Sequence, residues 1–142
     1  MKKTLLFIFI LSSILSFGQG KDQKLQGKWV LFEVIDNTTG LTVPITHKSD
    51  IDYTYYIEFI DTLVKYNLEV NKCENEFSVN KKREIEFKYF STCTEFCCDD
   101  EFSGLLNYEE CTKYFIKEPK TEDAKQTLVM ISEERIFYFK KV

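Results

Sequence analysis

Cysteines are the residues of this 142-residue chain with the clearest capacity for chemistry. Cys93, Cys97 and Cys98 lie close together, Cys73 precedes them, and Cys111 follows. A structural zinc site favours two ligand pairs, each with about two to four intervening residues. The adjacent Cys97 and Cys98 with a single Cys111 make a poor second pair. A redox site favours Cys-x-x-Cys at the start of a helix, and Cys93 to Cys97 does not have that spacing. We therefore predict neither a metal site nor a redox centre.

Other catalytic groups are sparse. Histidine occurs once, as His47 in a polar stretch, so the sequence supplies no Ser-His or Cys-His pair. Asp50 with Asp52, and the run from Asp99 to Glu101, bring carboxylates together, as an acid–base pair or a calcium site requires. The second cluster is also explained as the acidic start of a helix. We predict no catalytic residue, no cofactor and no enzyme activity.

The first residues have the pattern of a secretory leader. Lys2 and Lys3 give a positive start, residues 5–15 are mostly apolar, and Ser16 and Gly18 supply small residues for cleavage. The apolar run is too short to span a bilayer, and no cysteine follows it to carry a lipid. We predict a signal peptide over residues 1–18 and a mature domain over residues 19–142. The mature domain is expected to be periplasmic or secreted, without a membrane span and not as a lipoprotein.

Export places the cysteines in an oxidising compartment, where disulfides persist. Because their number is odd, at least one stays free or pairs with another molecule. If Cys98 and Cys111 are both helical, roughly 20 Å separates them, which exceeds the distance of about 7 Å between Cα atoms that a disulfide spans. Adjacent Cys97 and Cys98 could bridge only in a strained ring. We predict a disulfide from Cys73 to one of Cys93, Cys97 or Cys98, with the partner left open.

The charge pattern excludes one class of partner. The chain has a formal net charge of −4, and its acidic and basic residues are interspersed. Nucleic-acid binding requires a clustered basic face. We therefore expect no nucleic-acid partner.

Alternation of apolar and polar residues predicts a β-rich domain. Val64, Tyr66, Leu68 and Val70 alternate with polar neighbours, as in a half-buried strand. Similar patterns predict strands near 28–36, 53–60, 76–79, 85–89, 114–117, 127–132 and 135–140. Residues 37–52 are expected to form a long loop, and Asp61 with Thr62 a tight turn.

One segment has helical periodicity instead. Phe102, Leu105, Leu106 and Tyr108 fall on one broad face of a helix near 99–112, with Cys111 near its edge. The fold class is therefore α+β, mostly β. We expect a curved antiparallel sheet or small barrel of about eight strands with one helix.

Several elements occur in an order that matches a known family. Leu25, Gly27 and Trp29 form a Leu-x-Gly-x-Trp opening, and Cys73-Glu74-Asn75 approximates a central Cys-Asn element. The later elements are a threonine step into cysteine at Thr92 or Thr94, a helix with Glu101, Leu105, Tyr108 and Cys111, a strand with Tyr114 and Ile116, and a hairpin from Leu128 to Phe139. In this order the chain resembles the META-domain family of small exported bacterial proteins, which includes a heat-shock-induced member.

The resemblance implies a compact β-rich fold with one helix and no catalytic site. It also implies a place in the periplasm or at the cell envelope and a role related to stress. On this basis we expect a non-catalytic module that acts by contact with a protein partner of unknown identity.

A second interpretation is a carrier. Gly27-Lys28-Trp29 matches the Gly-x-Trp that opens lipocalin-type barrels, which would hold a small apolar ligand. A carrier needs an open apolar cavity of about several hundred Å3. The META-like interpretation instead predicts a filled interior with the helix packed against it.

Overall fold

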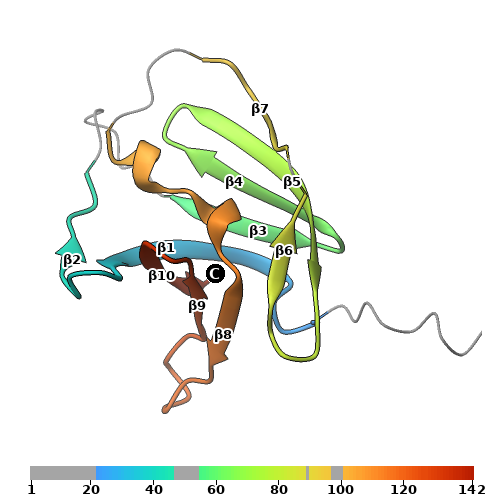
Figure 1. Cartoon of the computed structure of the whole chain (residues 1–142). Coiled ribbons are helices and arrows are strands. Elements are labelled where there is room, and N and C mark those ends of the chain that lie inside the picture. The colour runs from blue at the N-terminus through green and yellow to red at the C-terminus, as the bar shows by residue number, and fades with distance from the viewer. Residues whose placement is uncertain (1–21, 47–54, 89, 97–100) are drawn as a thin grey trace, which may run out of the picture.

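The computed structural model describes residues 22–46, 55–88, 90–96 and 101–142 (Figure 1). The sequence features that lie outside these ranges are the predicted leader, His47, Asp50, Asp52, Tyr89, Cys97, Cys98, Asp99 and Asp100.

The described chain is dominated by one antiparallel sheet. Its strands are β1 (Gly27–Asp36), β2 (Thr42–Val43), β3 (Tyr56–Ile60), β4 (Leu63–Leu68), β5 (Asn71–Val79), β6 (Ile85–Phe87), β7 (Thr92–Cys93), β8 (Lys113–Lys117), β9 (Thr127–Ile131) and β10 (Arg135–Lys141). Eight strands follow the order β6-β5-β4-β3-β1-β10-β9-β8, while β2 pairs with β1 and β7 pairs with β5.

The two ends of this order meet. Glu84 and Lys113 form a β-bridge just before β6 and at the start of β8. Next to it, the Ile85 amide donates to the Thr112 carbonyl at 3.0 Å, and the Tyr114 amide donates to the Arg83 carbonyl at 3.1 Å. The sheet is therefore a nearly closed barrel, which confirms the predicted class of a curved sheet or small barrel of about eight strands.

Strand lengths differ from the prediction in the middle of the chain. β5 begins at Asn71 rather than near residue 76, and β2 occupies part of the segment expected as loop. β7 was not predicted at all. The turn at Asp61 is where the sequence placed it, and Asp61 has a positive φ of 57°, a conformation common in the tight turns of hairpins.

The helical segment lies in the predicted place but is shorter than expected. It consists of two 3-10 turns, η1 (Ser103–Leu105) and η2 (Tyr108–Glu110). Leu106 and Asn107 separate them with ψ values of 53° and 71°, outside the helical range. No helix in the described ranges has the length and apolar character that a membrane crossing requires.

Apolar side chains converge inside the barrel. Trp29 is fully buried, and its Nε1 donates to the Leu25 carbonyl at 2.7 Å. Tyr108 of η2 reaches both sides of the barrel, with ring centroids 5.5 Å from Tyr66 on β4 and 5.1 Å from Phe137 on β10. The η1–η2 segment is thus packed inside the barrel, against strands from two sides.

Candidate functional site

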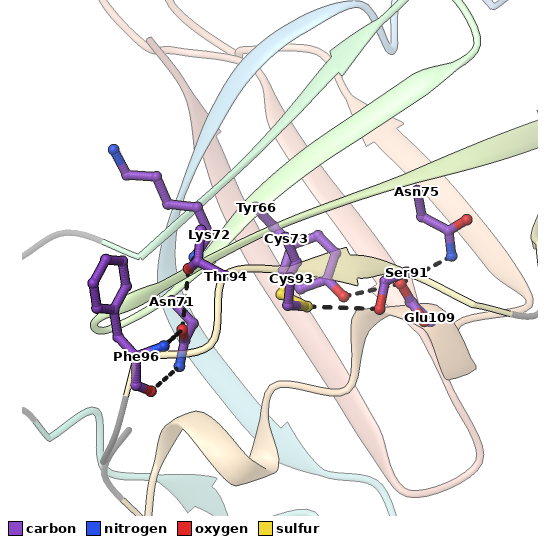
Figure 2. Close-up of a disulfide and its surroundings, with 10 residues drawn as sticks. All are labelled: Tyr66, Asn71, Lys72, Cys73, Asn75, Ser91, Cys93, Thr94, Phe96 and Glu109. Atoms are coloured by element: carbon purple, nitrogen blue, oxygen red, sulfur yellow. Dashed lines mark hydrogen bonds between the residues drawn. A yellow bond between two sulfur atoms is a disulfide. The ribbon is translucent and has the colours of Figure 1, made fainter.

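Three residues of β5 organise the site. Asn71, Cys73 and Asn75 alternate with Lys72 and Glu74, so they share one face of the strand. All three are buried, whereas the two charged residues between them are exposed. Each of the three attaches a part of the chain that follows β6, as Figure 2 shows.

The central attachment is covalent. Cys73 and Cys93 are direct cross-strand partners of β5 and β7, with 4.1 Å between their Cα atoms, and their sulfurs are bonded at 2.01 Å. Cys93 is one of the three partners that the sequence left open for Cys73. Cys93 is exposed, and its Sγ lies 3.7 Å from the Ser91 Oγ.

Asn71 holds the chain beyond β7. Its Oδ1 accepts hydrogen bonds from the Thr94 Oγ1 at 3.0 Å and the Phe96 amide at 2.8 Å. Its Nδ2 donates to the Phe96 carbonyl at 2.9 Å. We call residues 91–96 the arm, because the disulfide and Asn71 fasten it to the edge of β5 (Figure 2).

Asn75 joins the chain before the arm to the η2 turn. Its Nδ2 donates to the Lys88 carbonyl at 2.8 Å and to the Glu109 Oε1 at 2.9 Å. The same carboxylate oxygen accepts from the Tyr66 hydroxyl at 2.9 Å. Burial raises the pKa of Tyr66, a hydrogen bond with Ser91 lowers it, and the Glu109 carboxylate raises it further. Glu109 therefore connects η2 to the paired strands β4 and β5, through residues 43 and 34 positions earlier in the chain.

Asn71 offers a direct test of how the arm is held. Asn71→Ala removes three hydrogen bonds from a buried position and leaves the Phe96 amide without its described acceptor. We expect a loss of about 1–3 kcal/mol in the free energy of unfolding and faster hydrogen exchange at the Phe96 amide. The matched control is Lys72→Ala at the next, exposed position, which should change neither quantity. Equal exchange rates at the Phe96 amide in the two variants would contradict the conclusion that Asn71 holds the arm.

A surface hollow of about 370 Å3 lies beside the disulfide. Its rim combines charged and hydroxyl side chains with the two bonded cysteines. The lining residues are Tyr56, Lys65, Tyr66, Lys72, Cys73, Glu74, Thr92, Cys93 and Thr94.

The remaining described cysteine is separate from this site. Cys111 is a free, buried thiol, and burial raises its pKa, with a further contribution from Glu110. Of the sequence candidates, the structure therefore joins Cys73 and Cys93 and places Cys111 in the core. In the described residues, no group of three or more His, Cys, Asp or Glu side chains is arranged to hold a metal ion.

The buried thiol and phenol groups should make the free energy of unfolding depend on pH in the alkaline range. Burial also raises the pKa values of Tyr108 and Tyr114. The unfolded chain releases thiol and phenol protons from about pH 9 and 10, while the folded chain retains them. The unfolded state then binds fewer protons, so the free energy of unfolding falls as pH rises.

We therefore expect the urea midpoint to be level near pH 7–8 and to fall between about pH 9 and 11. Cys111→Ala should remove the earliest part of the fall, because the thiol titrates first in the unfolded chain. A midpoint that stays constant to about pH 11 in the unmodified chain would contradict this expectation.

Sequence reasoning missed Asn71, Asn75 and Glu109 as members of the site. A signal for the first two was present. The charged residues Lys72, Glu74 and Glu76 alternate with uncharged residues from Asn71 onward, so the period of two that marks a strand begins at Asn71. Glu109 carries no comparable signal, because its partners lie 34 and 43 residues away.

Comparison with known proteins supports the fold. The chain matches no family model and no curated protein. Among solved structures it is similar to the NMR structure of a protein from Burkholderia xenovorans, with a TM-score of 0.63 and 13% identity. The similarity covers 84% of this chain and 85% of that one. At this identity the likeness concerns the barrel-like architecture alone.

Proposed function

We propose that this protein is an exported, non-catalytic domain of META type that acts through contacts with another protein. The proposal includes a role at the cell envelope or in the response to stress. This part rests on the resemblance of the elements from Leu25 to Phe139 to the META-domain family. The unit that makes contact is the outside of the barrel, because its interior is occupied by the protein's own side chains.

The observation that carries the proposal is the packed interior. Tyr108 is 1% exposed and lies with its ring against Tyr66, Phe137 and Phe139. Phe102 of the same segment packs against Tyr55 at 5.2 Å between ring centroids. These rings occupy the space that a carrier barrel would leave for its ligand.

Export is supported by the leader pattern and by the Cys73–Cys93 disulfide, since disulfides persist mainly outside the cytoplasm. Fractionation of the native host followed by N-terminal sequencing tests this part. We expect Gln19 as the first residue, in the periplasm or the medium. Recovery of the chain with Lys2 and Lys3 from the cytoplasm would contradict export.

A carrier of a small apolar ligand is the second candidate, and one observation favours it. The Tyr108 hydroxyl is buried and has no hydrogen-bond partner among the described protein atoms. A carrier could satisfy it with a polar group of its ligand.

Tyr108→Phe separates the two candidates. In a filled barrel, removing an unsatisfied buried hydroxyl is expected to raise the free energy of unfolding by about 1 kcal/mol. The matched control is Tyr66→Phe, which removes a hydroxyl that donates to Glu109 and should be destabilising. If Tyr108→Phe lowers stability and also releases a bound compound, the carrier is favoured.

A further inference from the structure

One half of the barrel is apolar on its outer face as well as inside. The strands concerned are β1, β10, β9 and β8, which are neighbours in the sheet (Figure 1). β9 shows the pattern most clearly, because Leu128, Val129, Met130 and Ile131 are consecutive apolar residues. Such a run is typical of strands that are covered on both faces.

The middle row of this outer face is aromatic. Phe115, Val129 and Tyr138 are direct cross-strand neighbours. Phe32, at the β-bulge of β1, places its ring centroid 6.2 Å from that of Tyr138. Phe32 and Phe115 are 38% and 42% exposed, whereas Val129 is 4% exposed although it lies outside the interior cluster. The exposed parts of the row are therefore aromatic rings, and Glu33 lies opposite Tyr138 at its β1 end.

A second row lies on one side of it. Lys113, Ile131, Ile136 and Ile35 are cross-strand neighbours in that order. The three isoleucines are half-buried, and Lys113 is exposed at the end of the row. This row extends the apolar surface and ends at Lys113, which is paired with Glu84.

The third row lies on the other side and carries most of the charge. Lys117, Thr127, Lys140 and Val30 are neighbours in that order. The Lys140 ammonium lies 4.6 Å from the centroid of the Phe32 ring, and the Lys117 ammonium lies 5.4 Å from that of Tyr138. The carboxylates next to these rows are Glu33, opposite Tyr138, and Glu84, opposite Lys113. We call the three rows together the aromatic face.

The opposite half of the barrel differs in kind. Glu58, Lys65 and Glu74 are successive cross-strand neighbours on β3, β4 and β5. Opposite charges in such a ladder stabilise one another and remain exposed to water. On the aromatic face Lys113 is paired with Glu84, but the cross-strand neighbours of Lys117 and Lys140 are Thr127 and Val30. These two lysines have no carboxylate opposite them, on a chain whose net charge is −4.

We propose that the aromatic face docks a second protein whose surface presents apolar side chains flanked by carboxylates. This inference rests on the proposed function, since it names the surface and the partner chemistry of a contact module. Aromatic side chains dominate the energetics of protein interfaces. Carboxylates on the partner would take the lysine ammonium groups away from the Phe32 and Tyr138 rings and leave the rings free to pack.

Two other occupants fit less well. A second copy docked by the same face would bring lysines against lysines, and such like-charge contacts are strongly unfavourable. An anionic membrane would attract the lysines, but insertion requires rings that project beyond the charged groups. Here the ammonium groups of Lys117 and Lys140 lie over the rings.

The test is site-specific photo-cross-linking of the full-length chain in its native host. The photoreactive residue benzoylphenylalanine replaces Phe115 or Tyr138 on the aromatic face, and Lys65 or Glu74 as matched controls on the charged half. We expect adducts with a different protein from the first two positions only. Lys117→Glu combined with Lys140→Glu should reduce the Phe115 adduct by about tenfold or more, because it reverses the charge complementarity.

Four other outcomes would overturn the proposal, and each would point to a different conclusion. Adducts only from Lys65 or Glu74 would move the contact to the other half, and the contact function would stand. Adducts with a second copy of the chain or with lipid would show that this occupant, and not a different protein, binds the aromatic face. An adduct that is insensitive to charge reversal, in variants with an unchanged urea midpoint, would refute the carboxylate chemistry. Absence of protein adducts at all four positions would also refute the proposed function.

Discussion

Replacing Trp29 with alanine is expected to lower the free energy of unfolding by about 3–5 kcal/mol. Trp29 is fully buried in the barrel, and the substitution leaves a cavity in addition to the lost apolar contacts. It also removes the donor to the Leu25 carbonyl, which anchors the chain before β1. Because small domains are stable by only about 5–15 kcal/mol, the variant should be close to unfolding at moderate temperature.

Urea unfolding followed by circular dichroism measures the effect. Trp29→Phe is the second variant. It retains an aromatic ring but removes the hydrogen bond, so the free energy of unfolding should fall by only about 1–2 kcal/mol. The matched control is Phe32→Ala on the outer face of the same strand, which leaves no interior cavity. A loss below about 1 kcal/mol for Trp29→Ala would contradict a barrel packed around this residue.

Removing the disulfide should have the next largest effect. The bridge joins residues that are 20 positions apart, and on the chain-entropy estimate its loss costs about 3 kcal/mol. Cys93→Ala is the cleaner single variant, because Cys93 is exposed and its truncation disturbs little packing. The double variant Cys73→Ala/Cys93→Ala prevents Cys73 from pairing elsewhere and should show a similar loss.

Cys97→Ala and Cys98→Ala are the controls for pairing. Under non-reducing conditions both should keep the urea midpoint of the unmodified chain, and a reductant should then lower it in both. In the double variant the reductant should have no further effect. A large loss in Cys97→Ala or Cys98→Ala with none in Cys93→Ala would show that Cys73 pairs with a different partner.

The two regions in which prediction and structure differ have physical explanations. The spacing of Phe102, Leu106 and Tyr108 correctly placed these side chains in the core, because inward-facing positions follow from periodicity. Periodicity does not determine the backbone, however. Gly104 disfavours an α-helix. The two short turns η1 and η2 instead allow their side chains to pack against both walls of the barrel.

The site could be predicted only in part. A disulfide at Cys73 could be predicted because the leader-like pattern and the number of cysteines can be read from the sequence. The choice of Cys93 depends on the register of β7 against β5, and a two-residue strand leaves no pattern of its own. The roles of Asn71 and Asn75 depend on the same register, since each bonds to atoms of segments that follow β6.

Native mass spectrometry of the protein purified from its own host, without reductant, tests the central claim most directly. The claim is that the barrel is filled by its own side chains and works through its outer surface. We predict the mass of the bare mature chain, lower by at least the two hydrogen atoms lost in one disulfide, with no small molecule bound. One apolar compound per chain, released by organic extraction, would contradict the claim and establish the protein as a carrier.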